Sequence, residues 1–533
     1  MNGRCLKLSA NIAALAIFTF AVWRVGSMIT PEKIVASCNS PSRVADELND
    51  AVRLVRENVG PAESLVFHVD DLSRLDGLDR QFVSAIAFDR MPAKLPVVDC
   101  RANMLDSDWV IAERYSIMAQ RLKRGDTPYG LAAEDRYLSL FTRLGKATRS
   151  PVVSSSQSTL SWLRMAFSAL TVFVCVGLVS CMLSGTKTRL TLTPLTAVIS
   201  FGIVLAALCV LTHTLRSPNG TAVYAGKAKL WLTCGVPSGY LTDSAWLVFL
   251  PAYPPLLSVL SYLYYALAGT CDNWLVQFVP FAGVFWCMFV LFTRAGNALM
   301  KSAVVLFFSL SYSIYVIAGY YAEGYVALAL VLALSRIERG DSGLMTWLSA
   351  GIAALFKNEG LLFYIVLAFS HAVVMGCGRR HLLCMIAGAL PSAAWHLAVR
   401  ALGGGADGYD TNTLSIFLSH VWEALRELMT LFATEWKSGI HSLLLLMIAI
   451  AFSLKRKGYA RCRPSVMTGA FCVGSVLASV LVYGFCSDWN IDWRIHSSLF
   501  RLVWVSAAVS LWGMATLTSL PLAGNEEGEV VRA

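Results

Sequence analysis

Two apolar runs stand almost end to end in this chain: Ser302-Ala-Val-Val-Leu-Phe-Phe-Ser-Leu-Ser-Tyr-Ser-Ile-Tyr-Val-Ile-Ala-Gly319 and, after Tyr320 and Tyr321, Ala322-Glu-Gly-Tyr-Val-Ala-Leu-Ala-Leu-Val-Leu-Ala-Leu-Ser-Arg-Ile337. An α-helix crosses the hydrocarbon core of a bilayer with about 20 apolar residues, and a short inner helix needs somewhat fewer. Each run is therefore predicted to be a transmembrane helix, with a short turn between the two.

The composition gives the whole chain the same character. Of its 533 residues, 56% are hydrophobic and only 15% are charged, which is more apolar surface than a soluble core can use. The formal charge of +10 does not indicate nucleic-acid binding, because the basic residues are spread among short loops between apolar segments. Most of the 14 Cys lie inside apolar runs and no CxxC pair appears, so no structural metal site is predicted.

Hydropathy predicts a mainly α-helical, multi-pass transmembrane protein with about 12 crossings. The predicted spans lie near 9–29, 160–183, 193–214, 274–293, 302–319, 322–337, 343–357, 360–378, 382–400, 438–455, 465–486 and 498–518.

The basic residues predict the orientation of these spans, because short cytoplasmic loops carry an excess of Lys and Arg. Only one placement gathers them on one side. It puts on the cytoplasmic side Arg4, Lys7, Lys187, Arg189, Arg294, Lys301, Arg336, Arg339, Arg379, Arg380, Lys455, Arg456, Lys457, Arg461 and Arg463. Both termini are then predicted to be cytoplasmic.

The apolar run after Pro254-Pro255 tests this orientation. Counting 253–267 as a full crossing would place Arg379 and the basic run 455–463 outside, against the charge rule. We therefore interpret it as a juxtamembrane or re-entrant helix.

The chain divides into four predicted parts. They are an N-terminal membrane anchor helix at 1–29, an extracytoplasmic domain at 30–158, a transmembrane domain at 159–520 with an outer loop at 215–273, and a cytoplasmic tail at 521–533. The first apolar run lacks an A-x-A-like cleavage site and continues past Trp23 and Arg24, so we expect an uncleaved anchor rather than a signal peptide.

The region 30–158 is predicted to be a small α/β domain inserted after the first helix. Helical patterns occur at 44–59 and 75–88, and strand patterns at 64–69 and 95–98. Cys38 and Cys100 are its only cysteines. An oxidising compartment would permit a disulfide between them, which the spacing does not decide.

The first polar feature of the outer side is the loop from Asn219 to Lys229. Lys227 and Lys229 stand close to Tyr224 and Trp231, as in an interfacial helix whose cations meet lipid phosphates. Ordinary snorkelling of lysines at a membrane edge explains the same pattern.

Three further polar positions interrupt or border apolar segments. Glu323 stands between two spans, and an ionisable group at such depth is costly and therefore a functional candidate. Lys357 and Glu359 interrupt a long apolar stretch, where a cation would stabilise charge on a departing phosphate or simply mark a turn. His496 and Arg501 belong to a polar segment before the last span, which also fits an aromatic belt with a polar cap.

Taken in order, these motifs resemble the type-C (GT-C) glycosyltransferases, polytopic enzymes that use polyprenyl-phosphate-linked sugars and include protein O-mannosyltransferases and aminoarabinose transferases. The resemblance covers roughly 193–520. Its motifs are Lys227-Ala-Lys229 with the following Gly-x-Pro and Tyr253-Pro-Pro-Leu-Leu257, then Tyr321-Ala-Glu323, Lys357-Asn-Glu-Gly360 and His496-Ser-Ser-Leu-Phe-Arg501.

The resemblance implies a GT-C-like fold and a transfer of sugar to an envelope glycan, lipid or protein acceptor at the outer face of a bacterial cytoplasmic (inner) membrane. Asp243 and Glu323 are the implied catalytic carboxylates. The implied phosphate- or donor-binding residues are Lys227, Lys229, Lys357, His496 and Arg501, and the implied acceptor or loop residues are Asn219, Tyr224, Tyr253 and Glu359. No cofactor is implied with certainty, and a divalent metal stays open without being indicated.

This sequence departs from the family pattern at two acidic positions. Asn219-Gly220 stands where an acidic residue is expected before the Lys-Ala-Lys segment, and Glu323 stands where the family has Asp. An Asn cannot accept a proton as a carboxylate does, so Asp243 is the replacement candidate. Two alternatives stay open: a noncatalytic or repurposed envelope-assembly protein, and a transporter or flippase of lipid-linked sugars.

Overall fold

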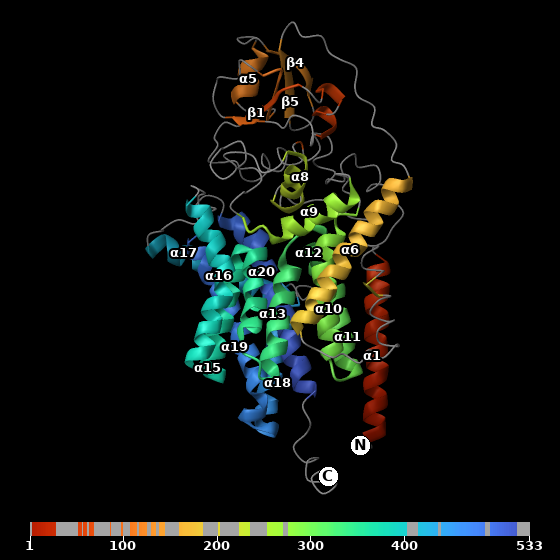
Figure 1. The fold of residues 1–533 in the computed structure, drawn as a ribbon, viewed down its shortest axis with the longest axis vertical. Coiled ribbons are helices and arrows are strands. Elements are labelled where there is room, and N and C mark those ends of the chain that lie inside the picture. Colours follow the sequence, from red (N-terminus) through yellow and green to blue (C-terminus); the bar gives the residue numbers. More distant parts are fainter. Residues whose placement is uncertain are drawn as a thin grey trace.

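A bundle of α-helices makes up most of the computed structural model, and a small sheet lies beyond one end of it (Figure 1). The structure describes residues 3–27, 52–55, 57–60, 63–68, 86, 97–99, 107–113, 117–124, 129–134, 138–143, 159–184, 201–202, 223–234, 253–269, 275–401, 414–434, 439–485 and 491–519.

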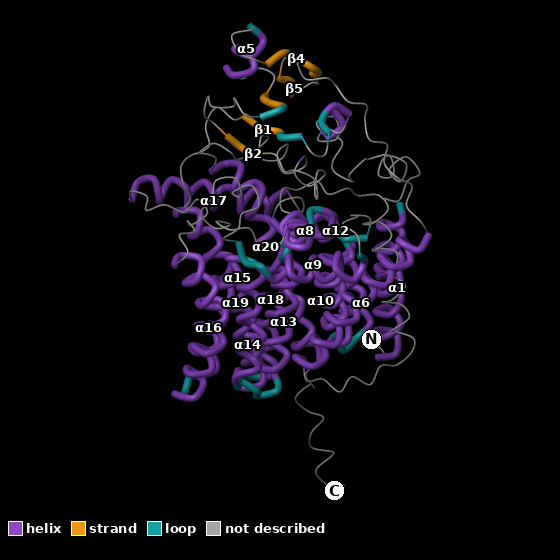
Figure 2. Tube along the Cα trace, turned by 45° about the horizontal axis from the view of Figure 1, so that its top comes forward, coloured by secondary structure: helices purple, strands orange, loops and turns teal. Residues whose placement is uncertain are grey.

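The helices of the bundle follow the predicted spans closely. They are α1 (Gly3–Gly26), α6 (Thr159–Ser184), α10 (Phe278–Arg294), α11 (Ala298–Ser309), α12 (Ser311–Ala318), α13 (Glu323–Glu338), α14 (Leu344–Phe356), α15 (Asn358–Met375), α16 (Arg379–Ala401), α18 (His441–Lys457), α19 (Tyr459–Val482) and α20 (Ile491–Ser519). Three more, α8 (Ala225–Cys234), α9 (Leu256–Ala268) and α17 (Leu414–Thr434), lie at the end of the bundle nearer the sheet (Figures 1 and 2). The predicted span 193–214 lies almost wholly outside the described residues.

The mainly helical prediction is confirmed, together with apolar helices of membrane-spanning length. Within the described ranges, four helices are long and apolar enough to cross a membrane: 358–375, 379–401, 459–485 and 498–519. The pair α11 and α12 adds a fifth if it counts as one bent span. The number of about 12 crossings stays a prediction.

The long helices expose apolar side chains, as expected of helices that lipid surrounds. Large apolar side chains such as Phe369, Leu383 and Leu397 are exposed along α15 and α16. Soluble proteins rarely expose such a large apolar surface, whereas lipid chains can cover it. In contrast, most of α20 is buried. We infer that α20 is a central helix and that α16 faces the lipid.

The predicted span 302–319 is two helices rather than one, bent by 52° at their junction. Leu310 takes an extended conformation there, with φ −67° and ψ 152°. The Ser313 hydroxyl donates to the Phe307 carbonyl oxygen at 3.0 Å. Side-chain hydroxyls of this kind satisfy backbone groups that a break in a membrane helix sets free.

The small sheet contains five strands in the order β2-β1-β3-β5-β4. They are β1 (Leu65–His68), β2 (Val97–Asp99), β3 (Trp109–Glu113), β4 (Tyr129–Glu134) and β5 (Leu138–Arg143), and the helix α5 (Ile117–Lys123) follows β3. β1 pairs in parallel with β2 and β3, and the other pairs are antiparallel.

Two of these strands were predicted, since β1 and β2 fall on the strand patterns at 64–69 and 95–98. The three strands and the helix from Trp109 onward were not. The predicted helix 44–59 is helical at the described residues 52–55 and 57–58, whereas Cys38, Cys100 and nearly all of 75–88 lie outside the described residues.

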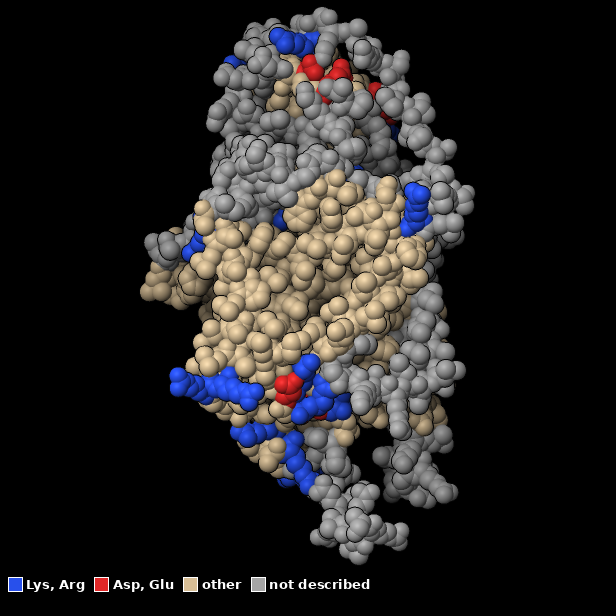
Figure 3. Space-filling view, in the orientation of Figure 1, with Lys and Arg blue, Asp and Glu red and all other residues tan. Residues whose placement is uncertain are grey.

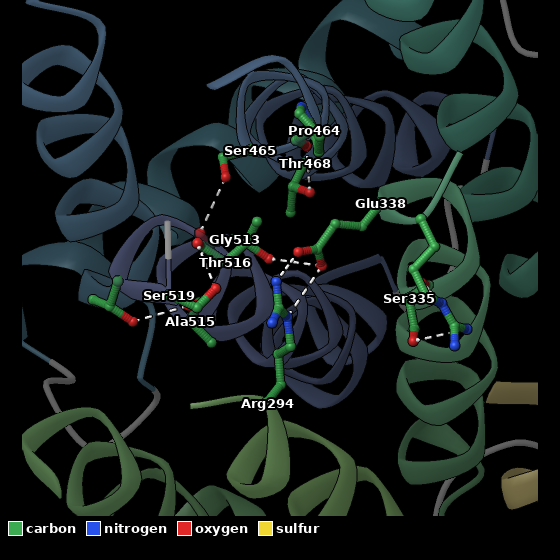
Figure 4. A network of polar contacts seen from close by, with 12 residues as sticks. Arg294, Ser335, Glu338, Pro464, Ser465, Thr468, Gly513, Ala515, Thr516 and Ser519 are labelled. Carbon is green, nitrogen blue, oxygen red and sulfur yellow. Dashed lines mark hydrogen bonds and ion pairs between the residues drawn. The ribbon is translucent and has the colours of Figure 1, made fainter. Parts of the chain in front are cut away.

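At the end of the bundle that points away from the sheet, a polar network connects three helices (Figure 4). Arg294 of α10 pairs with Glu338 of α13, and the Thr516 hydroxyl of α20 donates to Glu338 Oε2 at 3.2 Å. Lys and Arg gather at this end (Figure 3). The distribution agrees with the charge asymmetry from which the orientation was predicted.

Candidate functional site

The site is built around Glu323, the first residue of α13. Three residues before it, Tyr320 has a φ of 58°, in the left-handed region that bulky residues rarely adopt. The Tyr320 side chain is fully buried, and its hydroxyl lies 2.9 Å from Ser261 Oγ of α9. This anchored turn separates α12 from α13 and sets the direction in which α13 begins.

Lys357 lies at the break between α14 and α15, in an extended conformation with φ −157° and ψ 144°. Its Nζ atom is 2.8 Å from Glu323 Oε1 and 3.5 Å from Glu359 Oε1. Gly360 allows the break to be tight, since a Cβ there would stand 2.1 Å from the Ala353 carbonyl oxygen. The Lys-Asn-Glu-Gly motif therefore forms the turn that carries the lysine to the carboxylate.

Arg501 reaches Glu323 from α20, on the other side. Its Nη1 atom lies 3.3 Å from Glu323 Oε1, and its guanidinium carbon lies 4.2 Å from the centre of the Tyr321 ring. The Ser498 hydroxyl oxygen accepts from Nη2 at 3.0 Å. Two cations from separate parts of the chain thus contact one buried carboxylate. The attraction between these charges is stronger there than in water, because the surroundings have a low dielectric constant.

An aromatic wall from the outer loop borders this ion cluster. Tyr224, just before α8, lies edge-on to Tyr253 at 5.9 Å between ring centres and at 6.5 Å from the Tyr320 ring. Burial raises the pKa of the Tyr224 hydroxyl, and the Glu323 and Glu359 carboxylates raise it further. Burial and Glu359 act on the pKa of Tyr253 in the same direction. Both phenols are therefore neutral hydrogen-bonding groups at physiological pH.

Lys227 and Lys229 of α8 are both buried, with Lys227 fully enclosed. The Lys227 ammonium donates to the Tyr253 carbonyl oxygen at 3.1 Å. Buried side chains do not reach lipid, so both interpretations of these lysines, as cations that meet lipid phosphates and as snorkelling side chains, are wrong. The two lysines are cations of the protein interior, next to the aromatic wall.

The structure thus brings together six of the predicted site residues: Tyr224, Lys227, Tyr253, Glu323, Lys357 and Arg501, with Glu359 beside Lys357. Asn219 and Asp243 lie outside the described residues. His496 belongs to α20, and its side chain is not among those described. Tyr320 and Tyr321 were not predicted to be site residues, although the sequence shows this aromatic pair one residue ahead of an acidic residue between two apolar runs.

The charges of this cluster balance within the described residues. Lys357 and Arg501 contact Glu323, and Glu359 lies beside Lys357, which makes two cations and two carboxylates in a buried place. Glu323 Oε2 is buried and has no hydrogen-bond partner in the part of the chain that the structure describes. The arrangement can hold a phosphate near fixed cations and still offer a carboxylate oxygen to a hydroxyl.

Nothing in the described ranges resembles a metal centre, since no group of three or more His, Cys, Asp or Glu side chains comes together there. No family model, curated protein or solved structure matches the chain, so its geometry and sequence carry the functional argument.

Proposed function

We propose that this chain is a membrane glycosyltransferase of the GT-C type, which moves a sugar from a polyprenyl-phosphate donor to an envelope glycan, lipid or protein acceptor. The observation that supports it is the meeting of Lys357 and Arg501 on Glu323, three residues from separate motifs that the resemblance had named. Their convergence is what a site for a charged leaving group needs.

The proposed reaction is a displacement at the anomeric carbon of the donor sugar. An acceptor hydroxyl attacks that carbon, the bond between the carbon and the phosphate oxygen breaks, and polyprenyl phosphate leaves with the bonding electrons. Lys357 and Arg501 stabilise the phosphate as its charge grows. The proton of the acceptor hydroxyl passes to a carboxylate.

Glu323 is the described candidate for this base. Its Oε1 atom is held by the two cations, and its Oε2 atom is the one without a partner among the described residues. Asp243 is the second candidate from the sequence. The two ion pairs weaken Glu323 as a base, and arrival of the phosphate would draw both cations away from it and restore its basicity.

The outer face of a bacterial cytoplasmic membrane is the proposed place of the reaction. Lys and Arg gather at the end of the bundle opposite α8 and α9 (Figure 3). Under the charge rule that end is cytoplasmic, which puts the ion cluster near the other side and both termini inside.

Purified protein in lipid nanodiscs, supplied with a panel of polyprenyl-phosphate sugars together with envelope glycan, lipid and protein acceptors, tests the proposal through the release of polyprenyl phosphate. Lys357→Met is expected to lower kcat by about 100-fold or more, because one fixed charge on the leaving group is lost. Arg380→Met, which changes an exposed arginine of α16, is the matched control and should keep full activity. Absence of release with every donor would overturn the proposal.

A transporter or flippase is the second candidate, and the broken helices favour it. The 52° bend between α11 and α12 and the charged break at Lys357 are features from which transporters build sites within the membrane. Proteoliposomes loaded with lipid-linked sugar separate the two functions: a flippase moves the intact donor between leaflets without an acceptor, whereas a transferase consumes it only when an acceptor is present.

A further inference from the structure

A polar cavity of about 180 Å³ opens between α17, α12 and α20, apart from the ion cluster. Tyr312 and Phe500 line one side of it, and Glu427, Thr430 and Thr434 of α17 line the other. We propose that this cavity binds a sugar ring of the donor or of the acceptor glycan, an assignment that rests on the proposed function.

The aromatic side of the cavity suits the apolar face of a sugar. The Tyr312 and Phe500 rings contact each other with their centres 4.8 Å apart, and Phe500 is buried. Carbohydrate rings present C–H groups on their faces, and such groups pack on aromatic rings, while their hydroxyls need polar partners at the edges.

The side formed by α17 supplies those partners, and all of them can accept hydrogen bonds. The Thr430 hydroxyl donates to the Arg426 carbonyl oxygen at 3.0 Å, and the Thr434 hydroxyl donates to the Thr430 carbonyl oxygen at 2.8 Å. Each hydroxyl has thus committed its proton within the helix and keeps its acceptor capacity. With the Glu427 carboxylate, the cavity selects a ligand rich in donors.

This acceptor chemistry separates the cavity from the cation site. The Thr430 and Thr434 hydroxyls have no proton left to donate to a phosphate, which brings only acceptors, whereas a hydroxylated or amino sugar brings the donors that these hydroxyls accept. The size agrees, since pockets for drug-sized ligands measure about 300–1,000 Å³ and this cavity suits a single ring-sized group.

A continuous row of aromatic rings joins the cavity to the ion cluster. The Phe500 ring lies 5.3 Å from that of Tyr315, which in turn lies 5.3 Å from that of Tyr321. The Arg501 guanidinium covers Tyr321 and reaches Glu323. A sugar in the cavity would therefore lie at one end of this row of rings, and the proposed phosphate site would lie at the other end.

Direct binding of free monosaccharides tests the cavity without relying on turnover. Saturation-transfer NMR on the full chain in nanodiscs, with neutral and amino monosaccharides as probes, should show contact with ring protons. Thr430→Trp fills the cavity and should reduce that contact at least fivefold. Met429→Trp, at a neighbouring α17 position that is 61% exposed, is the matched control and should leave it unchanged. Equal contact in all three proteins would overturn the proposal.

Glu427→Gln provides a variant of nearly the same size in which only the charge is lost. We expect its preference for amino sugars over neutral sugars to fall about fivefold or more, as when a hydrogen bond to a charged group becomes a neutral one. An unchanged preference would contradict the role of Glu427.

Kinetics with a turning-over donor then identify the source of the sugar. In Thr430→Trp, a higher KM for the acceptor assigns the cavity to the acceptor glycan, and a higher KM for the donor, with sugar-free polyprenyl phosphate still bound, assigns it to the donor sugar. Sugar contact without any turnover would contradict the proposed function but support the proposed sugar site. Turnover that Thr430→Trp leaves unaffected would support the proposed function but contradict the sugar site.

Discussion

At the scale of the residue, Glu323 is a buried carboxylate that two cations contact. Its side chain is almost fully buried and so is that of Lys357. Taking two such charges out of water is costly, and their attraction compensates only while both partners and their hydrogen bonds stay in place. A change on either side of the pair should therefore affect folding as well as any chemistry.

Lys357→Met is expected to lower the free energy of unfolding by about 3 kcal/mol, because a buried carboxylate loses one of its two cations. Arg501 keeps Glu323 partly compensated, so the loss should fall at the low end of the range for broken buried pairs. Unfolding in mixed micelles measures it. The exposed Arg380→Met variant should change the same quantity by no more than about 0.5 kcal/mol. Similar values for the two variants would contradict a buried ion pair.

Asp341, in the turn between α13 and α14, predicts a dependence on pH. Burial raises the pKa of its carboxyl, but the hydrogen bond from Arg336 at 2.5 Å, the Gly343 N–H and the charges of Arg336 and Arg339 outweigh this and lower the pKa below its usual range. A group with a lowered pKa in the folded state stabilises the fold above its unfolded pKa and loses that contribution as the pH falls through the folded one.

Asp341→Asn should therefore melt at a lower temperature than the unchanged protein near neutral pH. The difference should shrink as the pH falls below about 3.9, the ordinary pKa of aspartate. Scanning fluorimetry between neutral and acid pH follows it. A difference that grows on acidification would have the wrong sign for this ion pair.

At the scale of the element, the break between α14 and α15 is the feature that places Lys357. The two helices approach so closely that a side chain at Gly360 has no room, and the Gly360 N–H donates to the Lys357 carbonyl oxygen at 2.9 Å. A longer or looser turn would move the lysine away from Glu323.

Gly360→Ala is accordingly expected to destabilise the protein by about 1–3 kcal/mol through overpacking, and to lower the proposed transferase activity by displacing Lys357. Gly378→Ala is the matched control, since it changes a glycine just beyond α15 with no atom near the added Cβ. Micelle unfolding and the nanodisc assay report both effects. If the two alanine variants behave alike, the tight turn does not position the lysine.

At the scale of the whole molecule, the distribution of charge predicts which side faces the cytoplasm. Arg379, Arg380, Arg461 and Arg463 are exposed. Lys and Arg gather at the end of the bundle opposite α8 and α9 (Figure 3). Short basic loops are retained in the cytoplasm.

Topology reporters check this orientation. A green fluorescent protein fused at the C-terminus or after Met375 should fluoresce, and alkaline phosphatase fused after Gly269 should be active. Alkaline phosphatase fused after Met375 is the control and should be inactive. An active fusion there would reverse the orientation and move the ion cluster to the other side of the membrane.

The helices agree with the sequence prediction because hydropathy is a local property. A membrane helix satisfies its backbone hydrogen bonds within the segment, so an apolar run of sufficient length indicates the element without knowledge of its neighbours. The 13-residue α9 likewise follows the Tyr-Pro-Pro run interpreted as juxtamembrane. In contrast, β3 depends on pairing with β1 and β5, which lie far from it in the sequence, and it was missed. The local pair of β4 and β5 was missed as well.

By itself, then, the sequence determined the mainly helical class, the bounds of most helices and the residue types available to the site. Only the tertiary structure decided that Lys357 and Arg501 share Glu323, that Lys227 is buried, and that α11 and α12 are separate helices. The physical reason is the sequence separation of the interacting residues. A helix forms through interactions between neighbouring residues, whereas a buried charge is compensated by partners that packing brings from distant parts of the chain.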